Sequence, residues 1–204
     1  MELTSNIARD LLDIEAVQIR PNDYFTWTSG IKSPIYCDNR LTMSYPEVRN
    51  KITEAFVHLI EQMDEKPDVI AGCATAGIPQ AGWVADKLNL PMVYVRSKPK
   101  GHGKGNQIEG QIKAGQKIVV IEDLISTGGS SIEAAKALEN EGANVLRVLA
   151  IFTYGLRKSA ERFAEAGLTH QTITNYDELL QLLVEDSTLT NAEKQQLEDW
   201  RNAL

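Results

Sequence analysis

The 204-residue chain has few cysteines, no long apolar run and no excess of basic residues. Its two cysteines, Cys37 and Cys73, lie far apart and outside any C-x-x-C pattern, which argues against a disulfide framework and a structural zinc site. No basic stretch precedes an apolar run near the N-terminus, so we expect no signal peptide, no transmembrane helix and a cytoplasmic location. The formal net charge of -7 argues against a general nucleic-acid binder.

The chain also lacks internal repeats, low-complexity tracts and linkers rich in Pro, Gly or Ser. Its hydrophobic content of 43% is sufficient for a packed core. We therefore expect a single domain over residues 1–204, with a small N-terminal subregion at 1–43 and a core at 44–204.

The spacing of apolar residues predicts the order of the elements. An amphipathic helix is expected over residues 4–16, followed by an irregular hairpin within 17–43 and by a helix that opens with a capping box from Ser44 to Glu47. Strands are then expected at 69–72, 92–96, 117–121, 145–152 and 170–174, and helices at 78–88, 130–141, 156–166 and 176–183. This alternation predicts an α/β fold with a doubly wound, mostly parallel sheet flanked by helices. A last helix is expected to be capped by Thr190 with Glu193.

The richest motif is IVVIEDLISTGGSS at residues 118–131. The run IVVI has no polar alternation, as expected for a strand covered on both faces. Glu122 and Asp123 follow it, and a Ser-Thr-Gly-Gly-Ser turn at 126–130 leads into a helix. Free amides at a helix N-terminus bind phosphate, and glycines let the backbone approach it. The acids suit sugar hydroxyls or a hydrated magnesium ion held by substrate phosphates, so the motif predicts a ribose-5-phosphate site.

Two better-known phosphate motifs do not fit this segment. No G-K-[ST] follows the glycines, so it is not a P-loop, and the Rossmann fingerprint has no acid pair before its glycines. The remaining histidines, His58 and His170, have no second metal-ligand candidate nearby in the sequence, so we expect no metal site of the protein's own.

The 118–131 segment closely resembles the phosphoribosyl-diphosphate signature of the type I phosphoribosyltransferases. The resemblance implies that Glu122 and Asp123 contact the ribose hydroxyls and that the turn after them binds the 5-phosphate. The residues of this turn are Leu124, Ile125, Ser126, Thr127, Gly128, Gly129 and Ser130.

Three further segments narrow the resemblance to orotate phosphoribosyltransferases. Residues 24–34 resemble that family's N-terminal hood, residues 72–79 its pyrophosphate-binding loop, and residues 95–103 its catalytic loop. Because these segments follow one another in the family's order, the resemblance covers nearly the whole chain. It implies transfer of a phosphoribosyl group from phosphoribosyl diphosphate to orotate, with Mg2+ as cofactor, in a homodimer whose catalytic loop reaches the neighbouring subunit's site.

The resemblance also implies roles for individual side chains. Arg96, Lys100 and His102 are expected to bind phosphoribosyl diphosphate and to stabilise the departing pyrophosphate. They lie in a hydrophilic, glycine-rich stretch at 96–113, which by its composition alone predicts a mobile cationic lid. Ser126, Lys32 and Tyr36 are expected to contact orotate.

The chain departs from the family pattern at a few positions. Many members carry lysine at the positions that are here Thr28, Ala76 and Ser97, and some carry arginine at the position of Tyr154. Lys32 or Arg40 could supply the positive charge that the carboxylate of the base requires.

Two other functions share the phosphate motif. A phosphoribosyltransferase for xanthine or another purine would keep the turn, but the hood and the K-x-H loop favour orotate. A non-catalytic sensor of phosphoribosyl diphosphate would also keep the turn. Such regulators tend to lose the lid and to gain a nucleic-acid surface, whereas this chain retains Lys100 and His102 and is acidic.

Overall fold

The computed structural model describes residues 2–26, 30, 32–98 and 107–204. Its centre is a six-stranded sheet of order β10-β9-β8-β5-β6-β7, in which only β7 runs antiparallel to its neighbour. The strands are β5 (Val69–Cys73), β6 (Met92–Val95), β7 (Ile108–Glu109), β8 (Lys117–Ile125), β9 (Asn144–Thr153) and β10 (His170–Asn175). The predicted doubly wound, mostly parallel sheet is confirmed.

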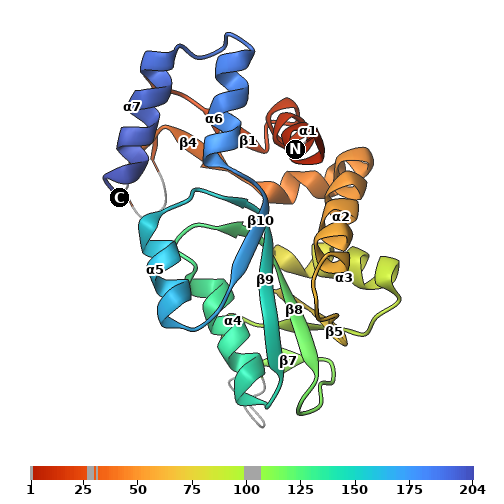
Figure 1. Cartoon of the computed structure of the whole chain (residues 1–204). Coiled ribbons are helices and arrows are strands. Elements are labelled where there is room, and N and C mark those ends of the chain that lie inside the picture. The colour runs from red at the N-terminus through yellow and green to blue at the C-terminus, as the bar shows by residue number, and fades with distance from the viewer. Residues whose placement is uncertain (1, 27–29, 31, 99–106) are drawn as a thin grey trace.

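Helices cover both faces of this sheet (Figure 1). The helices α2 (Pro46–Glu61) and α3 (Gly77–Leu88) pack on one face, and α4 (Gly129–Asn140) and α5 (Arg157–Glu165) on the other. Val119 and Ile121 of β8 belong to the apolar cluster of the first face, and Ile118 and Val120 to that of the second. The continuous IVVI run is thus explained by burial on both faces.

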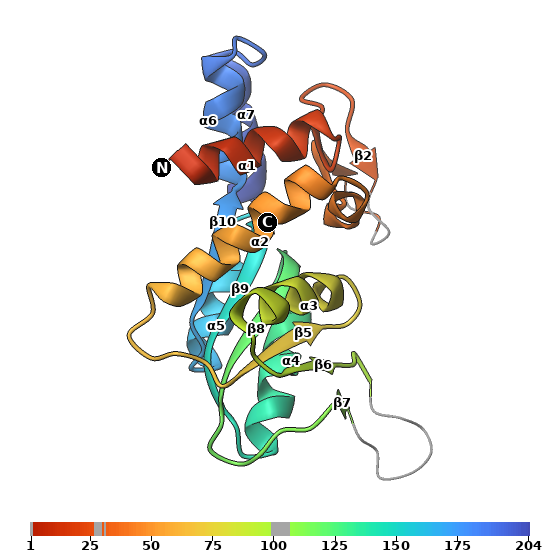
Figure 2. The same cartoon turned by 90° about the vertical axis from the view of Figure 1, so that its right-hand side faces the viewer.

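The two ends of the chain pack together beyond the sheet (Figure 2). The N-terminal region contains α1 (Glu2–Asp13), a pair formed by β1 (Val17–Ile19) and β4 (Ile35–Cys37), and a second pair formed by β2 (Phe25–Thr26) and β3 (Lys32–Ser33). The C-terminal helices α6 (Tyr176–Glu185) and α7 (Asn191–Asn202) lie against it. The Trp200 indole donates to the carbonyl of Lys32 at 3.1 Å, and Arg9 forms an ion pair with Asp186 at 2.6 Å.

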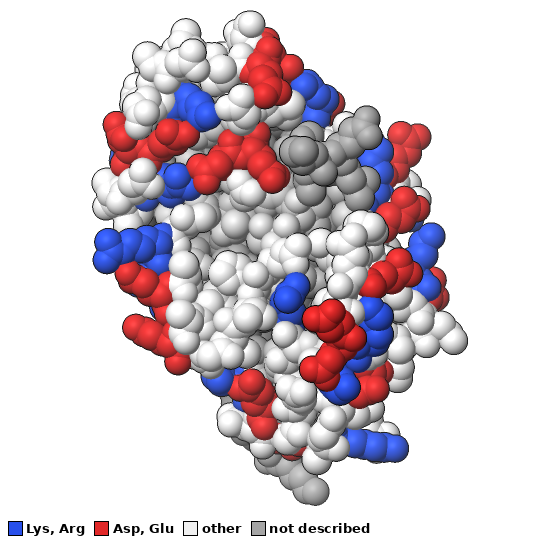
Figure 3. Space-filling view, viewed as in Figure 1, with Lys and Arg blue, Asp and Glu red and all other residues white. Residues whose placement is uncertain are grey.

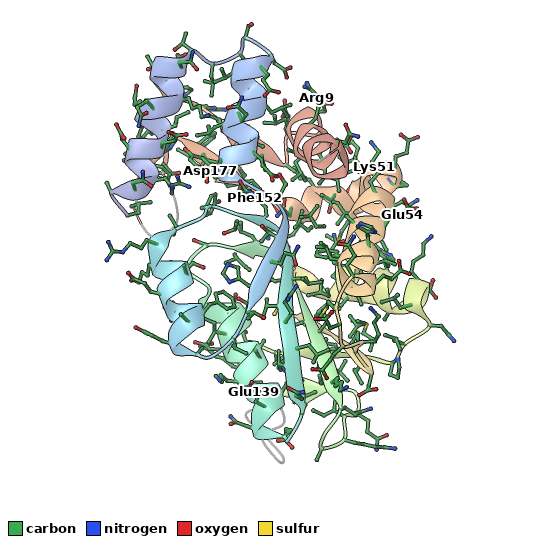
Figure 4. All side chains as sticks on the ribbon, viewed as in Figure 1. Arg9, Lys51, Glu54, Glu139, Phe152 and Asp177 are labelled. Atoms are coloured by element: carbon green, nitrogen blue, oxygen red, sulfur yellow. The ribbon has the colours of Figure 1, made fainter. Side chains whose placement is uncertain are left out.

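The helices of this region are also joined to the core by charged side chains. Arg9 on α1 and Lys51 on α2 are both labelled in Figure 4. The Lys51 ammonium lies 2.8 Å from a carboxylate oxygen of Asp10, which connects α2 to α1. On the face shown in Figure 3, acidic and basic side chains lie mostly around the periphery, and the middle carries few of them. Among the described residues, no helix has the length and hydropathy needed to cross a bilayer.

Most predicted boundaries lie within one or two residues of the observed ones, but some differ for a physical reason. The capping box at Ser44 is wrong: Ser44 ends the 3-10 helix η1 (Asn39–Ser44), and Tyr45 is the N-cap of α2, without a side-chain cap bond. Pro46 opens the helix instead, with its fixed φ and no amide to satisfy. The first helix ends at Asp13 rather than 16, and Glu15 follows in the left-handed region at φ 57°. By contrast, the Thr190–Glu193 capping box is confirmed.

The predicted end of β8 at Ile121 is also too early. The strand continues through the acid pair to Ile125, because β9 pairs with it along this stretch, with Glu122 opposite Ala150 and Leu124 opposite Phe152. The carboxyl groups of Glu122 and Asp123 lie close enough for each to affect the pKa of the other.

Candidate functional site

The order of the strands places a crevice between β5 and β8. From β5 the chain continues to β6 on one side, whereas from β8 it continues to β9 on the other. At such a switch point the loops after the two strands diverge, and ligands of open α/β sheets bind there. The loop after β5 is the predicted pyrophosphate loop, and the segment after IVVI is the predicted phosphoribosyl motif. The fold thus brings together two motifs that are about fifty residues apart in the sequence.

The acid pair lies near the carboxyl end of β8, at this switch point. The Glu122 side chain is 5% exposed and accepts hydrogen bonds from the Ser130 hydroxyl at 3.0 Å and from the Asp123 amide at 3.1 Å. The Ser130 bond joins the strand end to the first turn of α4. On the other side, the carbonyl of Asp123 accepts a hydrogen bond from the Asn39 side-chain amide at 2.7 Å. Both acids are therefore held in place by groups from other elements.

Burial of two neighbouring carboxyl groups changes their protonation. Desolvation raises the pKa of Glu122 to about 8, and the Asp123 carboxylate beside it adds to the effect. Burial also raises the pKa of Asp123. A cation or hydroxyl donors in the crevice would favour the ionised form of both groups. Oxygen ligands of this kind fit Mg2+. Among the described residues, no group of three or more His, Cys, Asp or Glu is placed to hold a metal ion.

We expect Glu122→Gln to stabilise the unliganded protein at alkaline pH. The ordinary carboxyl pKa is 4.5 and the folded value is about 8, so the folded state binds this proton more tightly. The contribution to stability is present at low pH and is lost as the pH rises through the folded pKa. Without substrate or divalent cations, the variant should melt about 5 °C or more above the wild type at pH 9, with a smaller gap at pH 5.

Thermal melts at both pH values test this expectation. Glu141→Gln is the control, because Glu141 is an exposed glutamate at the end of α4. An equal difference in melting temperature at pH 5 and pH 9 for Glu122→Gln would contradict the assignment of the raised pKa to Glu122.

The turn after the acid pair has the backbone that phosphate binding requires. Gly128 is the N-cap of α4 with φ at 75°, a left-handed conformation that disfavours other residues. A β-carbon on Gly128 would lie 2.8 Å from the Phe163 ring. No side chain caps α4, so the amides of its first turn remain available to an anion. On the outside of the turn, the Arg162 guanidinium donates to the Thr127 carbonyl at 3.3 Å.

The predicted pyrophosphate loop is pressed against the acid pair. It joins β5 to α3, and Gly77 begins that helix. A β-carbon on Gly77 would lie 2.4 Å from the carbonyl oxygen of Ile121 and 3.3 Å from the Cα of Glu122. Only a glycine allows α3 to approach β8 this closely, so Gly77 sets the distance between the loop and the acids.

Arg96 completes the described part of the crevice. It follows β6, and its guanidinium lies 3.3 Å from the Glu109 carboxylate. A cavity of about 30 Å³ connects it to the two loops, with Arg96, Ala74, Ser130 and Glu133 among the lining residues. The predicted site residues from β6, β5 and α4 therefore share one space. Lys100 and His102 lie outside the described residues.

Comparisons with known proteins give the same assignment. The Phosphoribosyl transferase domain family matches residues 44–175. An orotate phosphoribosyltransferase of Oceanobacillus iheyensis is 61% identical over 99% of this chain and 100% of its own length. One of Enterococcus faecalis is 58% identical over 98% of this chain and 95% of its own.

The chain belongs to the orotate phosphoribosyltransferase family. Solved structures agree with this assignment. The orotate phosphoribosyltransferase of Aeropyrum pernix has a TM-score of 0.76 at 25% identity and covers 90% of this chain and 99% of its own. The UMP synthase of Leishmania donovani has a TM-score of 0.80 at 25% identity over 98% of this chain and 42% of its own.

The hood residues of this orotate phosphoribosyltransferase family member lie in two groups. The Lys32 ammonium donates to the Thr26 hydroxyl at 2.8 Å, within the β2–β3 pair. Tyr36 on β4 is 39% exposed, and its ring centroid lies 5.7 Å from that of Phe25. Thr28, one of the departures from the family, lies outside the described residues.

Tyr154 and Arg40 lie nearer to the acid pair. Tyr154 directly follows β9 and is 4% exposed, with its ring edge-on to that of Phe152, which Figure 4 labels. Burial raises the pKa of the Tyr154 hydroxyl. The nearby Cys37, Asp123 and Tyr36 raise this pKa further. The Arg40 guanidinium donates to Asp38 at 2.6 and 2.8 Å and lies within electrostatic range of Asp123. The positive charge of Arg40 therefore interacts with the acid pair.

Sequence reasoning missed Asn39 and Arg162, the side chains that hold the backbone of the motif from outside. Asn39 is separated from Asp123 by 84 residues and Arg162 from Thr127 by 35. Neither belongs to a recognisable motif, so no local signal in the sequence indicates these contacts.

Proposed function

We propose that this chain transfers the 5-phosphoribosyl group from phosphoribosyl diphosphate to orotate, giving orotidine 5′-phosphate and pyrophosphate in de novo pyrimidine biosynthesis. The main support is the buried acid pair at the switch point, directly beside the uncapped N-terminus of α4. Sugar hydroxyls and a 5-phosphate require this combination of acceptors and amide donors. The family membership identifies the base as orotate.

The proposed roles of the described residues follow from their positions. Amides of the 126–130 turn hold the 5-phosphate, while Glu122 and Asp123 accept hydrogen bonds from the ribose hydroxyls and so orient the anomeric carbon. A ring nitrogen of orotate attacks this carbon as pyrophosphate leaves, through a transition state with oxocarbenium character. Glu122 or Asp123 would help to hold Mg2+ bound with the substrate, and the ion would supply charge neutralisation at the pyrophosphate.

The departing pyrophosphate requires positive charge from the protein. We assign this role to Arg96, beside the described cavity, and to Lys100 and His102 of the catalytic loop. In the proposed homodimer, the loop of one subunit serves the crevice of the other. For the base we assign Ser126 and Tyr36, with Lys32 or Arg40 facing the orotate carboxylate.

Steady-state assays with four bases test the proposal. Orotate, hypoxanthine, xanthine and adenine are each supplied with phosphoribosyl diphosphate and Mg2+, and pyrophosphate release is measured. We expect turnover with orotate alone. Activity only with a purine would replace the proposed substrate while leaving the phosphoribosyl site in place.

A further inference from the structure

A chain of buried polar side chains connects the 3-10 helix η1 to the acid pair. Asn39, Thr42 and Gln80 are 1%, 0% and 2% exposed. The Asn39 amide donates to the carbonyl of Asp123 at 2.7 Å, the Thr42 hydroxyl to the carbonyl of Asn39 at 2.6 Å, and the Gln80 amide to the Thr42 hydroxyl at 3.2 Å. One connected set of bonds therefore joins η1, β8 and α3.

Asn39 contacts β8 beyond the point where the pairing of β8 with β5 ends. The pairing of β5 with β8 ends at Gly72 opposite Ile121, so beyond that point β8 is paired with β9 alone. Asp123 lies two residues beyond, and its carbonyl receives a side-chain donor from Asn39 in place of a strand partner. This hydrogen bond fixes the peptide that carries the acid pair on its otherwise unpaired side.

Burial of the Asn39 side chain has a free-energy cost, which the hydrogen bond to Asp123 offsets. Burying an amide side chain is unfavourable unless its hydrogen bonds are made. The side-chain oxygens of Asn39 and Gln80 are buried without a hydrogen-bond partner among the described groups. An apolar residue at position 39 would avoid this cost, but it would leave the Asp123 carbonyl without its donor.

We propose that Asn39 is a positioning residue that acts through Asp123. Its amide orients the acid pair toward the ribose hydroxyls and fixes the distance between these acids and the 36–40 segment, which carries the candidate base contacts Tyr36 and Arg40. This inference rests on the proposed function, because it takes the acid pair as the ribose site.

A double-mutant cycle on the full-length protein tests the coupling. The variants are Asn39→Ala, Asp123→Asn and the double variant, and calorimetry measures the affinity for phosphoribosyl diphosphate at a fixed Mg2+ concentration. Each single variant should weaken binding about tenfold, the scale of one lost hydrogen bond to a charged or buried group. The affinity of the double variant should be no lower than that of the single variant with the lower affinity.

A second ligand separates positioning from general damage. Inorganic pyrophosphate lacks the ribose hydroxyls, so Asn39→Ala should change its affinity less than twofold. The matched control is Thr53→Val. Thr53 is a buried residue of α2 whose hydroxyl donates to the Arg49 carbonyl at 2.8 Å, away from the acid pair. This variant also loses a buried hydrogen bond, but it should bind both ligands as the wild type does.

The outcomes separate the inference from the proposed function. If Asp123→Asn weakens phosphoribosyl diphosphate but Asn39→Ala does not, or if the two effects add, Asn39 does not act through Asp123. If Asp123→Asn binds this ligand like the wild type, the assignment of the ribose site fails. Should Asn39→Ala not fold, the isosteric Thr42→Val removes the next hydroxyl in the set. Thr42→Val should weaken the binding of phosphoribosyl diphosphate about threefold, and this effect should not add to that of Asp123→Asn. If the two effects add, the inference is again overturned.

Discussion

Replacing Gly77 by alanine should lower kcat/KM by about 100-fold, because a displacement of reacting groups by about 1 Å has an effect of this size. The added methyl carbon would lie 2.4 Å from the Ile121 carbonyl oxygen, which is backbone within a central strand. The sheet cannot yield, so α3 and the loop before it must move away from β8. Overpacking of this kind also costs about 1–3 kcal/mol of stability, which thermal melts would detect.

Gly82→Ala is the matched control for this prediction. Gly82 lies on the same helix, and a β-carbon there would meet only the Met92 sulfur at 3.8 Å, an ordinary contact. Because alanine favours a helix interior, this variant should keep full activity and melt at or above the wild-type temperature. Equal activity of Gly77→Ala and Gly82→Ala would show that the close approach of α3 to β8 is not needed for the reaction.

The elements that the sequence predicted best are those specified by local patterns. The IVVI run is apolar throughout because helices cover both faces of β8, and this burial produces the continuous pattern that indicates a central parallel strand. The glycines of the 126–130 turn likewise reflect a local requirement, the left-handed backbone of Gly128. The sheet and the glycine turn at 126–130 could therefore be predicted from neighbouring residues alone.

The remaining features depend on partners far away in the sequence. The extension of β8 through Glu122 and Asp123 is caused by pairing with β9, and polar residues at a strand end give no local sign of it. Ser44 and Glu47 have the spacing of a capping box, but the preceding 3-10 helix already uses Ser44. The bond from Asn39 to Asp123 and the packing of α7 on the β2–β3 pair arise only from the tertiary fold.

Lys100→Ala should lower kcat by about 100- to 1000-fold while changing the affinity for phosphoribosyl diphosphate much less. The reason is that negative charge on the pyrophosphate grows as the bond to the sugar breaks, so a cation there stabilises the transition state more than the bound substrate. Lys98→Ala removes the same charge from the same basic stretch and should retain most of the activity. Equal losses in both variants would indicate general electrostatic attraction instead of a specific role.

The same variant tests whether the loop is shared between subunits. Lys100→Ala and Asp123→Asn remove groups that, in the proposed dimer, meet in one site only when they come from different chains. Unfolding and refolding the two impaired variants together should therefore produce hybrid dimers with one intact site and an activity above that of either variant alone. A mixture no more active than its components would place Lys100 in the site of its own chain. A loss of substrate affinity without a loss of kcat in Lys100→Ala would remove its proposed role in the transition state.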